Sequence, residues 1–152
     1  MPQVPPAARV AARRVLLYEA GGRMEPAALA EAAERADARL RARLADLIGL
    51  TGYTTLLARA VRLAQVDVPA LAGVAVVAGE TGEPAAEGRL RGVPDFTRAS
   101  GDAAAIEAGL SAILAHVIGL LITFIGEDLA LRLVHEAWPD LASDQAASEG
   151  HA

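Results

Sequence analysis

The pattern of apolar and polar positions along this chain predicts helices. One stretch, residues 108–126 (AGLSAILAHVIGLLITFIG), contains no charged side chain, which suits either a membrane span or the centre of a helical bundle. Asp102 is placed to cap a helix that begins at Ala103. Gly126 is followed by an amphipathic segment that Pro139 ends, so we expect a break near Gly126.

The clearest amphipathic pattern begins at Pro26. Apolar residues recur there at steps of three and four, predicting one buried helix face: Leu29, Ala33, Ala36, Leu40, Leu44 and Leu47. The polar face carries Glu31 with Arg35 and Asp37 with Arg41, four residues apart, as exposed ion pairs. Gly49 is expected to end this helix and Thr51 to cap another over 53–65, giving an antiparallel hairpin.

The remaining segments are less regular. A first helix is predicted over 7–20, ended by two glycines, after a flexible N-terminus at 1–6. The apolar run 68–78 fits a helix or a strand, and we favour a helix. Glycines and prolines predict a long irregular loop over about 79–101, in which Phe96 is placed to attach the loop to the body. The tail 142–152 is expected to be disordered.

Together these segments predict an all-α, single-domain bundle of four to five helices over 7–141, around a central apolar helix at about 103–126. Three observations favour a bundle core over a membrane span. Acids flank the apolar run at Glu107, Glu127 and Asp128 without a cluster of arginines, and His116 lies near its middle. The other helices also carry apolar faces that need a common core.

Composition excludes several classes of protein. Cysteine is absent, so disulfides, thiolate catalysis and Cys-based metal sites are excluded. The net charge of −5 is uneven: residues 1–66 hold ten arginines and six acids, and residues 67–152 hold four arginines and thirteen acids. The N-terminus lacks the features of a secretory signal, so we expect a cytoplasmic protein, with a membrane location as the alternative.

No catalytic or metal-binding spacing is recognisable. Ser111 lies within the apolar helix and lacks the motif of a nucleophilic serine, so it is interpreted as a packing residue. His116 has no ligand-type residue at the helical neighbour positions and is expected to be a core imidazole bonded to a backbone carbonyl. We therefore predict no catalytic residue, no metal and no cofactor.

The candidate partner-binding surface is basic. Arg35, Arg39 and Arg43 align along one side of the second helix, and Arg59 and Arg62 are expected to extend this patch across the hairpin. Trp138 is either an interface anchor or a plug at the end of the core. The acidic balance of the chain argues against nucleic acid as the partner.

These observations predict a non-enzymatic helical module for protein interaction or regulation, with a protein partner or a homo-oligomer. The alternative is a small membrane-associated protein that inserts 108–126. An enzyme with an unrecognised site comes third, because the polar groups are scattered along the chain.

Overall fold

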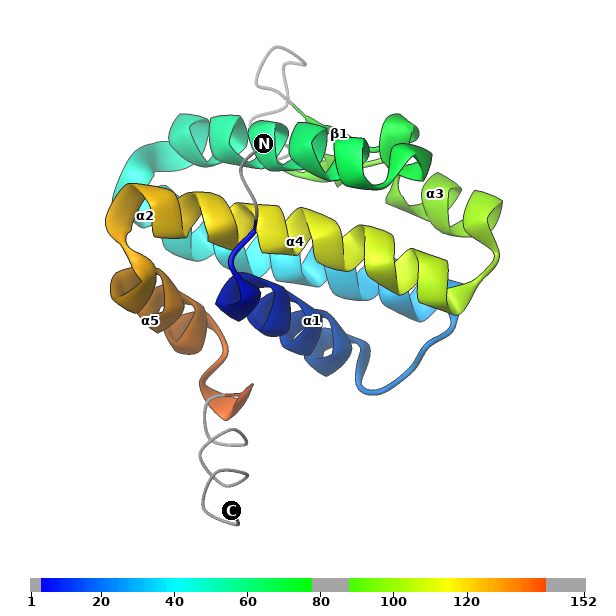
Figure 1. The fold of residues 1–152 in the computed structure, drawn as a ribbon, viewed down its shortest axis with the longest axis horizontal. Coiled ribbons are helices and arrows are strands. Elements are labelled where there is room, and N and C mark those ends of the chain that lie inside the picture. The colour runs from blue at the N-terminus through cyan, green and yellow to red at the C-terminus, as the bar shows by residue number, and fades with distance from the viewer. Residues whose placement is uncertain (1–3, 78–87, 142–152) are drawn as a thin grey trace.

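The computed structural model describes residues 4–77 and 88–141. Within these residues the chain is an all-α bundle with one two-stranded ribbon (Figure 1). The expectations for the first three residues, for the tail 142–152 and for most of the first half of the 79–101 loop lie outside the described residues. The predicted all-α bundle around an apolar central helix is confirmed.

The central helix is α4 (Ala103–Ile125), and it packs against α1, α2, α3 and α5. Asp102 caps it as expected, because its carboxylate accepts a 3.3 Å hydrogen bond from the Ala104 amide. Every residue from Ile113 to Leu121 is buried, so the middle of α4 is covered on all sides. A helix that is apolar all round is stable in water only when other helices cover it in this way.

Helix α1 (Pro6–Ala20) lies against α4 and α2. It buries small and branched apolar side chains on one face, and Gly21 ends it in the left-handed conformation. The predicted first helix is therefore present, and it begins at Pro6.

Helix α2 (Pro26–Asp67) is two helices joined by a sharp bend at Gly49. The two arms, 26–48 and 50–67, fold back on each other. The evidence is that the Tyr53 hydroxyl reaches the Asp37 carboxylate, sixteen residues earlier. Sixteen residues of straight helix would separate them by about 24 Å. The predicted hairpin is confirmed. Two details are wrong. Thr51 lies inside the second arm and does not cap it, because the non-helical residue of α2 is Gly49. Leu47 is 55% exposed, because it lies beside the bend and beyond the helices that cover the core.

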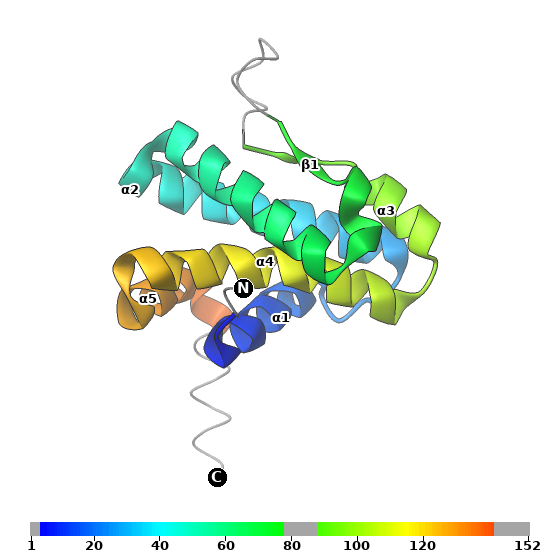
Figure 2. The same cartoon turned by 45° about the horizontal axis from the view of Figure 1, so that its top comes forward.

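The second bend is at Gly126, where α4 meets α5 (Glu127–Ala137). Gly49 has φ 83° and ψ 158°, and Gly126 has φ 88° and ψ 157°. Only glycine adopts this region without strain. The first arm of α2 runs alongside α4 in the same direction, and both bends lie at the same end of the bundle (Figure 2). The expected break near Gly126 is thus confirmed.

The two bent helices are related by an internal repeat of 77 residues. Adding 77 to the bounds of the first arm, 26–48, gives 103–125, the bounds of α4. Seven buried positions of this arm map onto buried positions of α4: Leu29, Ala32, Ala33, Ala36, Asp37, Leu40 and Leu44 onto Ile106, Gly109, Leu110, Ile113, Leu114, Val117 and Leu121. Tyr53 and Leu57 likewise map onto Ala130 and Val134 of α5. The chain is built from two similarly bent helices.

The connection between the two repeats differs from the expected helix and loop. The described part of the helix expected over 68–78, residues 68–77, contains a short 3-10 helix, η1 (Pro69–Gly73), and strand β1 (Ala75–Val76) in place of a long helix. Strand β1 pairs with β2 (Leu90–Arg91) in an antiparallel register. The C-terminal part of the expected loop is helix α3 (Val93–Ser100). It is ordered because Val93 and Phe96 are buried, with the Phe96 ring against Gly109 of α4.

Candidate functional site

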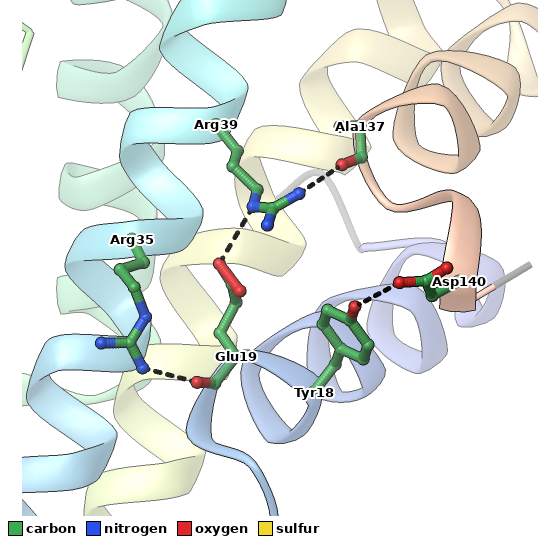
Figure 3. A network of polar contacts seen from close by, with 6 residues as sticks. All are labelled: Tyr18, Glu19, Arg35, Arg39, Ala137 and Asp140. Atoms are coloured by element: carbon green, nitrogen blue, oxygen red, sulfur yellow. Dashed lines mark hydrogen bonds and ion pairs between the residues drawn. The ribbon is translucent and has the colours of Figure 1, made fainter.

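The three aligned arginines of α2 bind the C-terminal ends of two other helices. Figure 3 shows two of them, Arg35 and Arg39. Arg35 Nη2 donates to the Glu19 carbonyl of α1 at 2.5 Å, and Arg39 Nη1 donates to the Ala137 carbonyl of α5 at 3.0 Å. Arg43 Nη2 donates to the Glu136 carbonyl at 3.0 Å. The last carbonyls of a helix lack partners within the helix. These arginines therefore supply the missing donors and fasten α1 and α5 to α2.

Arg39 differs from the other two in the burial of its acidic partner. Its Nε lies 3.3 Å from Glu19 Oε2, and the Glu19 side chain is only 7% exposed. Arg35 and Arg43 form longer ion pairs at exposed sites, 3.8 Å to Glu31 and 3.9 Å to Glu136. Exposed pairs contribute little to stability, whereas a covered carboxylate needs a partner.

Tyr18 adds a contact between α1 and the chain after α5. Its hydroxyl donates a 3.0 Å hydrogen bond to Asp140 Oδ2 (Figure 3). This bond holds the phenol proton, and with partial burial it raises the pKa of Tyr18. Together with the contacts of Arg39, this hydrogen bond holds α1, α2 and the end of α5 together.

Arg59 and Arg62 do not extend this arginine cluster. Asp37 and Tyr53 mark the faces that the two arms of α2 turn toward each other. At about 100° per residue, Arg39 lies on the far side of the first arm from Asp37, and Arg62 on the far side of the second arm from Tyr53. Arg59 and Arg62 are exposed and form no ion pair with the described residues. The hairpin thus points its arginines to opposite sides, contrary to the expected single patch.

Trp138 belongs to the core. It is 1% exposed and follows α5 directly, so it closes one end of the packed interior. Its Nε1 atom has no hydrogen-bond partner among the described residues. This burial fits the interpretation of Trp138 as a plug at the end of the core, and not as an interface anchor. As a surface anchor it would have to leave the core.

Asp37 is buried, which corrects its assignment to an exposed face. It is 3% exposed, because the second arm of α2 and β2 cover it. Tyr53 donates to Oδ1 at 2.5 Å, and the Leu90 amide donates to Oδ2 at 3.2 Å. Burial raises the pKa of Asp37 to about 6, although these hydrogen bonds oppose the rise. Burial likewise raises the pKa of Tyr53.

His116 is a buried imidazole, 6% exposed, but its partner is a carboxylate and not a backbone carbonyl. Its Nε2 lies 2.8 Å from Asp67 Oδ2, at the last residue of α2. Ser111 lies elsewhere on the same helix, and its Oγ has no hydrogen-bond partner among the described residues. No three metal-ligating side chains converge within the described part of the chain.

Large apolar side chains are exposed at both glycine bends. Leu47 and Ile48 precede Gly49 and are 55% and 42% exposed, and Phe124 and Leu129 flank Gly126 and are 67% and 43% exposed. We call these four residues the bend patch. Sequence reasoning missed it, although the triplets Leu47-Ile48-Gly49 and Phe124-Ile125-Gly126 recur 77 residues apart.

The fold and these surfaces define the protein as a helical bundle of two bent-helix repeats. No protein-family model, curated protein or solved structure matches the chain.

Proposed function

We propose that this protein is a non-enzymatic interaction module of the cytoplasm, which binds an amphipathic, basic helix of a partner protein through the bend patch. The observation that carries the proposal is the exposure of Leu47, Ile48, Phe124 and Leu129 at one end of the bundle. Exposed large apolar side chains that gather at one place are typical of interaction surfaces. Two of the four, Leu47 and Phe124, occupy equivalent positions 77 residues apart in the repeat.

The charges around the bend patch indicate the chemistry of the partner. Segments 46–51 and 124–129 hold three acids, Asp46, Glu127 and Asp128, and no basic residue. All three acids are exposed. An apolar surface with an acidic border is complementary to a helix that has one apolar face and basic flanks. The same border opposes binding to a second copy of this end and to an anionic membrane.

The proposed partner surface is the bend patch with its acidic border, whereas the sequence led us to expect a basic surface of arginines. Arg35, Arg39 and Arg43 already bind carbonyl groups within the chain, so an acidic partner would compete with α1 and α5 for them. The residues of the bend patch have no such internal role, because their side chains project from the core.

The proposal is tested with two synthetic helices of eighteen residues. Both carry the same leucine face, and the polar face is lysine in one and glutamate in the other. We expect the lysine helix to bind the full chain at least about tenfold more tightly, as measured by fluorescence anisotropy at low salt. Replacing Leu47 and Phe124 together by Ser should weaken that binding at least about tenfold, because each buried apolar side chain contributes roughly 1.5–3 kcal/mol.

The matched control replaces two exposed valines elsewhere in the chain, Val10 and Val66, by Ser. They are 54% and 57% exposed, similar to Leu47, but lie outside the bend patch. This variant should bind the lysine helix as the unchanged chain does. Equal binding by both double variants, or no binding of the lysine helix, would overturn the proposal.

The membrane alternative rests on α4. It is the helix in the described part of the chain that is long and apolar enough to span a membrane, with a mean hydropathy of 2.2. In the bundle, however, 61% of its most apolar window is buried against other helices. Insertion would require α1, α2 and α5 to leave it. Sedimentation with zwitterionic vesicles, resistant to carbonate extraction, would favour this alternative over the interaction module.

A further inference from the structure

A cavity of about 430 Å³ lies between α1, α4 and the end of α2. It is far along α4 from the bend patch and shares none of its residues. Its polar lining residues come from all three helices: Arg9 and Arg13 of α1, Asp67 of α2, and Glu107, Ser111 and His116 of α4. Ala108, Ala112 and Ala115 form an apolar wall along α4. Cavities of this size and mixed lining suit small molecules.

Both carboxylates of the cavity already have partners. Arg13 Nε donates a 2.6 Å hydrogen bond to Glu107 Oε1, and the Glu107 side chain is 15% exposed. His116 Nε2 lies 2.8 Å from Asp67 Oδ2. Each pair engages one carboxylate oxygen with a donor from the lining of the cavity itself.

Two polar side chains of the lining, Ser111 and Arg9, form no hydrogen bond or ion pair with the described residues. Ser111 Oγ is buried and has no hydrogen-bond partner among the described residues. Arg9 forms no ion pair with any described residue, and Arg13 uses only its Nε atom. A buried hydroxyl without a partner reduces stability. The charged side chain of the lining that lacks a partner is therefore the Arg9 guanidinium, and with the Ser111 hydroxyl it accompanies the alanine wall.

We propose that this cavity binds a small monocarboxylate with an apolar body. Its carboxylate pairs with the guanidinium groups of Arg9 and Arg13, which bind carboxylates through parallel hydrogen bonds. Ser111 donates its hydroxyl proton to the same ligand. The apolar body lies on Ala108, Ala112 and Ala115, where side chains are small enough to leave room.

The test uses three probes of one chain length: octanoate, octanol and octylammonium. Binding to the full-length protein is measured by isothermal titration calorimetry at pH 7. We expect octanoate to bind at least about tenfold more tightly than octanol, and octylammonium to bind most weakly. Octanoate binding no tighter than octanol binding would overturn the proposal.

Variants locate the binding. Arg9→Gln should weaken octanoate binding about tenfold and leave octanol binding unchanged, because only the charged head loses a partner. Arg14→Gln is the matched control: Arg14 is also exposed on α1 but does not line the cavity, so octanoate binding should not change. Equal effects of the two substitutions would contradict the assignment to this cavity.

Ser111→Ala separates a binding role from a packing role. The substitution removes a hydroxyl without a partner, so the melting temperature should stay the same or rise, while octanoate binding weakens. Ala112→Phe should fill the cavity and abolish the binding of octanoate and octanol alike. If this larger side chain prevents folding, Arg9→Gln and Ser111→Ala still decide the question, because neither disturbs the packing. Unchanged octanoate binding in both would refute the proposal.

Discussion

Tyr53 and Asp37 form a buried pair across the α2 hairpin, with the phenol donating a 2.5 Å hydrogen bond to the carboxylate. The pair joins the two arms on either side of the Gly49 bend, and the Leu90 amide ties strand β2 to the same carboxylate. An ionisable group at the centre of three elements makes the stability of the hairpin depend on pH.

The direction of that dependence follows from the pKa of Asp37, which burial raises from 3.8 to about 6. Between these values the folded chain holds a proton that the unfolded chain has lost, so stability falls as the pH rises from about 4 to about 6. The difference corresponds to about 3 kcal/mol. Asp37→Asn lacks this dependence. The free energy of unfolding of the unchanged chain, relative to that of the variant, should therefore fall by about 2 kcal/mol from pH 4 to pH 7 in urea titrations, because part of the difference is already lost at pH 4. A constant difference over this range would contradict the assignment.

Arg39 should matter more for stability than its neighbours. Arg39→Ala leaves the Ala137 carbonyl and the enclosed Glu19 carboxylate without their partner, and we expect a loss of about 2 kcal/mol in urea denaturation. Arg43→Ala is the control, because Arg43 also binds a carbonyl of α5 but at an exposed site, and it should cost less than about 1 kcal/mol. Equal losses would show that burial of Glu19 does not set the effect.

Two positions on α4 distinguish its core from its exposed end. Ile113 is 1% exposed and Phe124 is 67% exposed. Ile113→Asp should place an unpaired charge in the interior and cost several kcal/mol, enough to unfold a domain of ordinary stability. Phe124→Asp should change stability by less than about 0.5 kcal/mol. Thermal melts that are alike for the two variants would be incompatible with α4 as the central helix.

Two glycines of α4 should respond in opposite ways to alanine. A Cβ at Gly109 would lie 2.6 Å from the Phe96 ring, so Gly109→Ala should push α3 away and cost about 1–3 kcal/mol. At Gly119 the nearest atom would be 3.6 Å away, so Gly119→Ala should stabilise the helix by up to about 1 kcal/mol. Melting temperatures measured by circular dichroism should thus move down for the first variant and up for the second.

The helices could be predicted because their determinants are local. Pro26, Gly49 and Asp102 act through the conformation and hydrogen bonds of their own segments, and the apolar periodicity repeats within each helix. Phe96 attaches the described part of 79–101 to the body as expected, with its ring against Gly109, but the helix α3 that this distant contact orders was not predicted. Glycines and prolines in the sequence indicated the turns but not the tertiary packing that orders the segment between them.

The candidate sites were harder to predict for the same reason. Asp37 fits an exposed ion-pair pattern by spacing, but the hairpin covers it with Tyr53. Arg35, Arg39 and Arg43 align as expected, yet the carbonyls that they bind come from α1 and α5, far away in the sequence. The partner of His116 is Asp67, forty-nine residues earlier. Periodicity shows which side of a helix a residue occupies, and the fold decides what meets it.

The first arm of α2 and helix α4 run in the same direction, and this makes the chain divisible. Parallel neighbours need a long return path, and here the second arm of α2 and residues 68–102 supply it. A polypeptide broken between β1 and β2 would leave one bent helix on each fragment, and the fragments carry opposite charge balances: +2 over residues 1–82 and −7 over residues 83–152. The fragments 1–82 and 83–152, produced separately, should therefore associate in solution and restore the bundle. The chain would then serve as a split protein, whose assembly reports that two proteins fused to its fragments are close to each other.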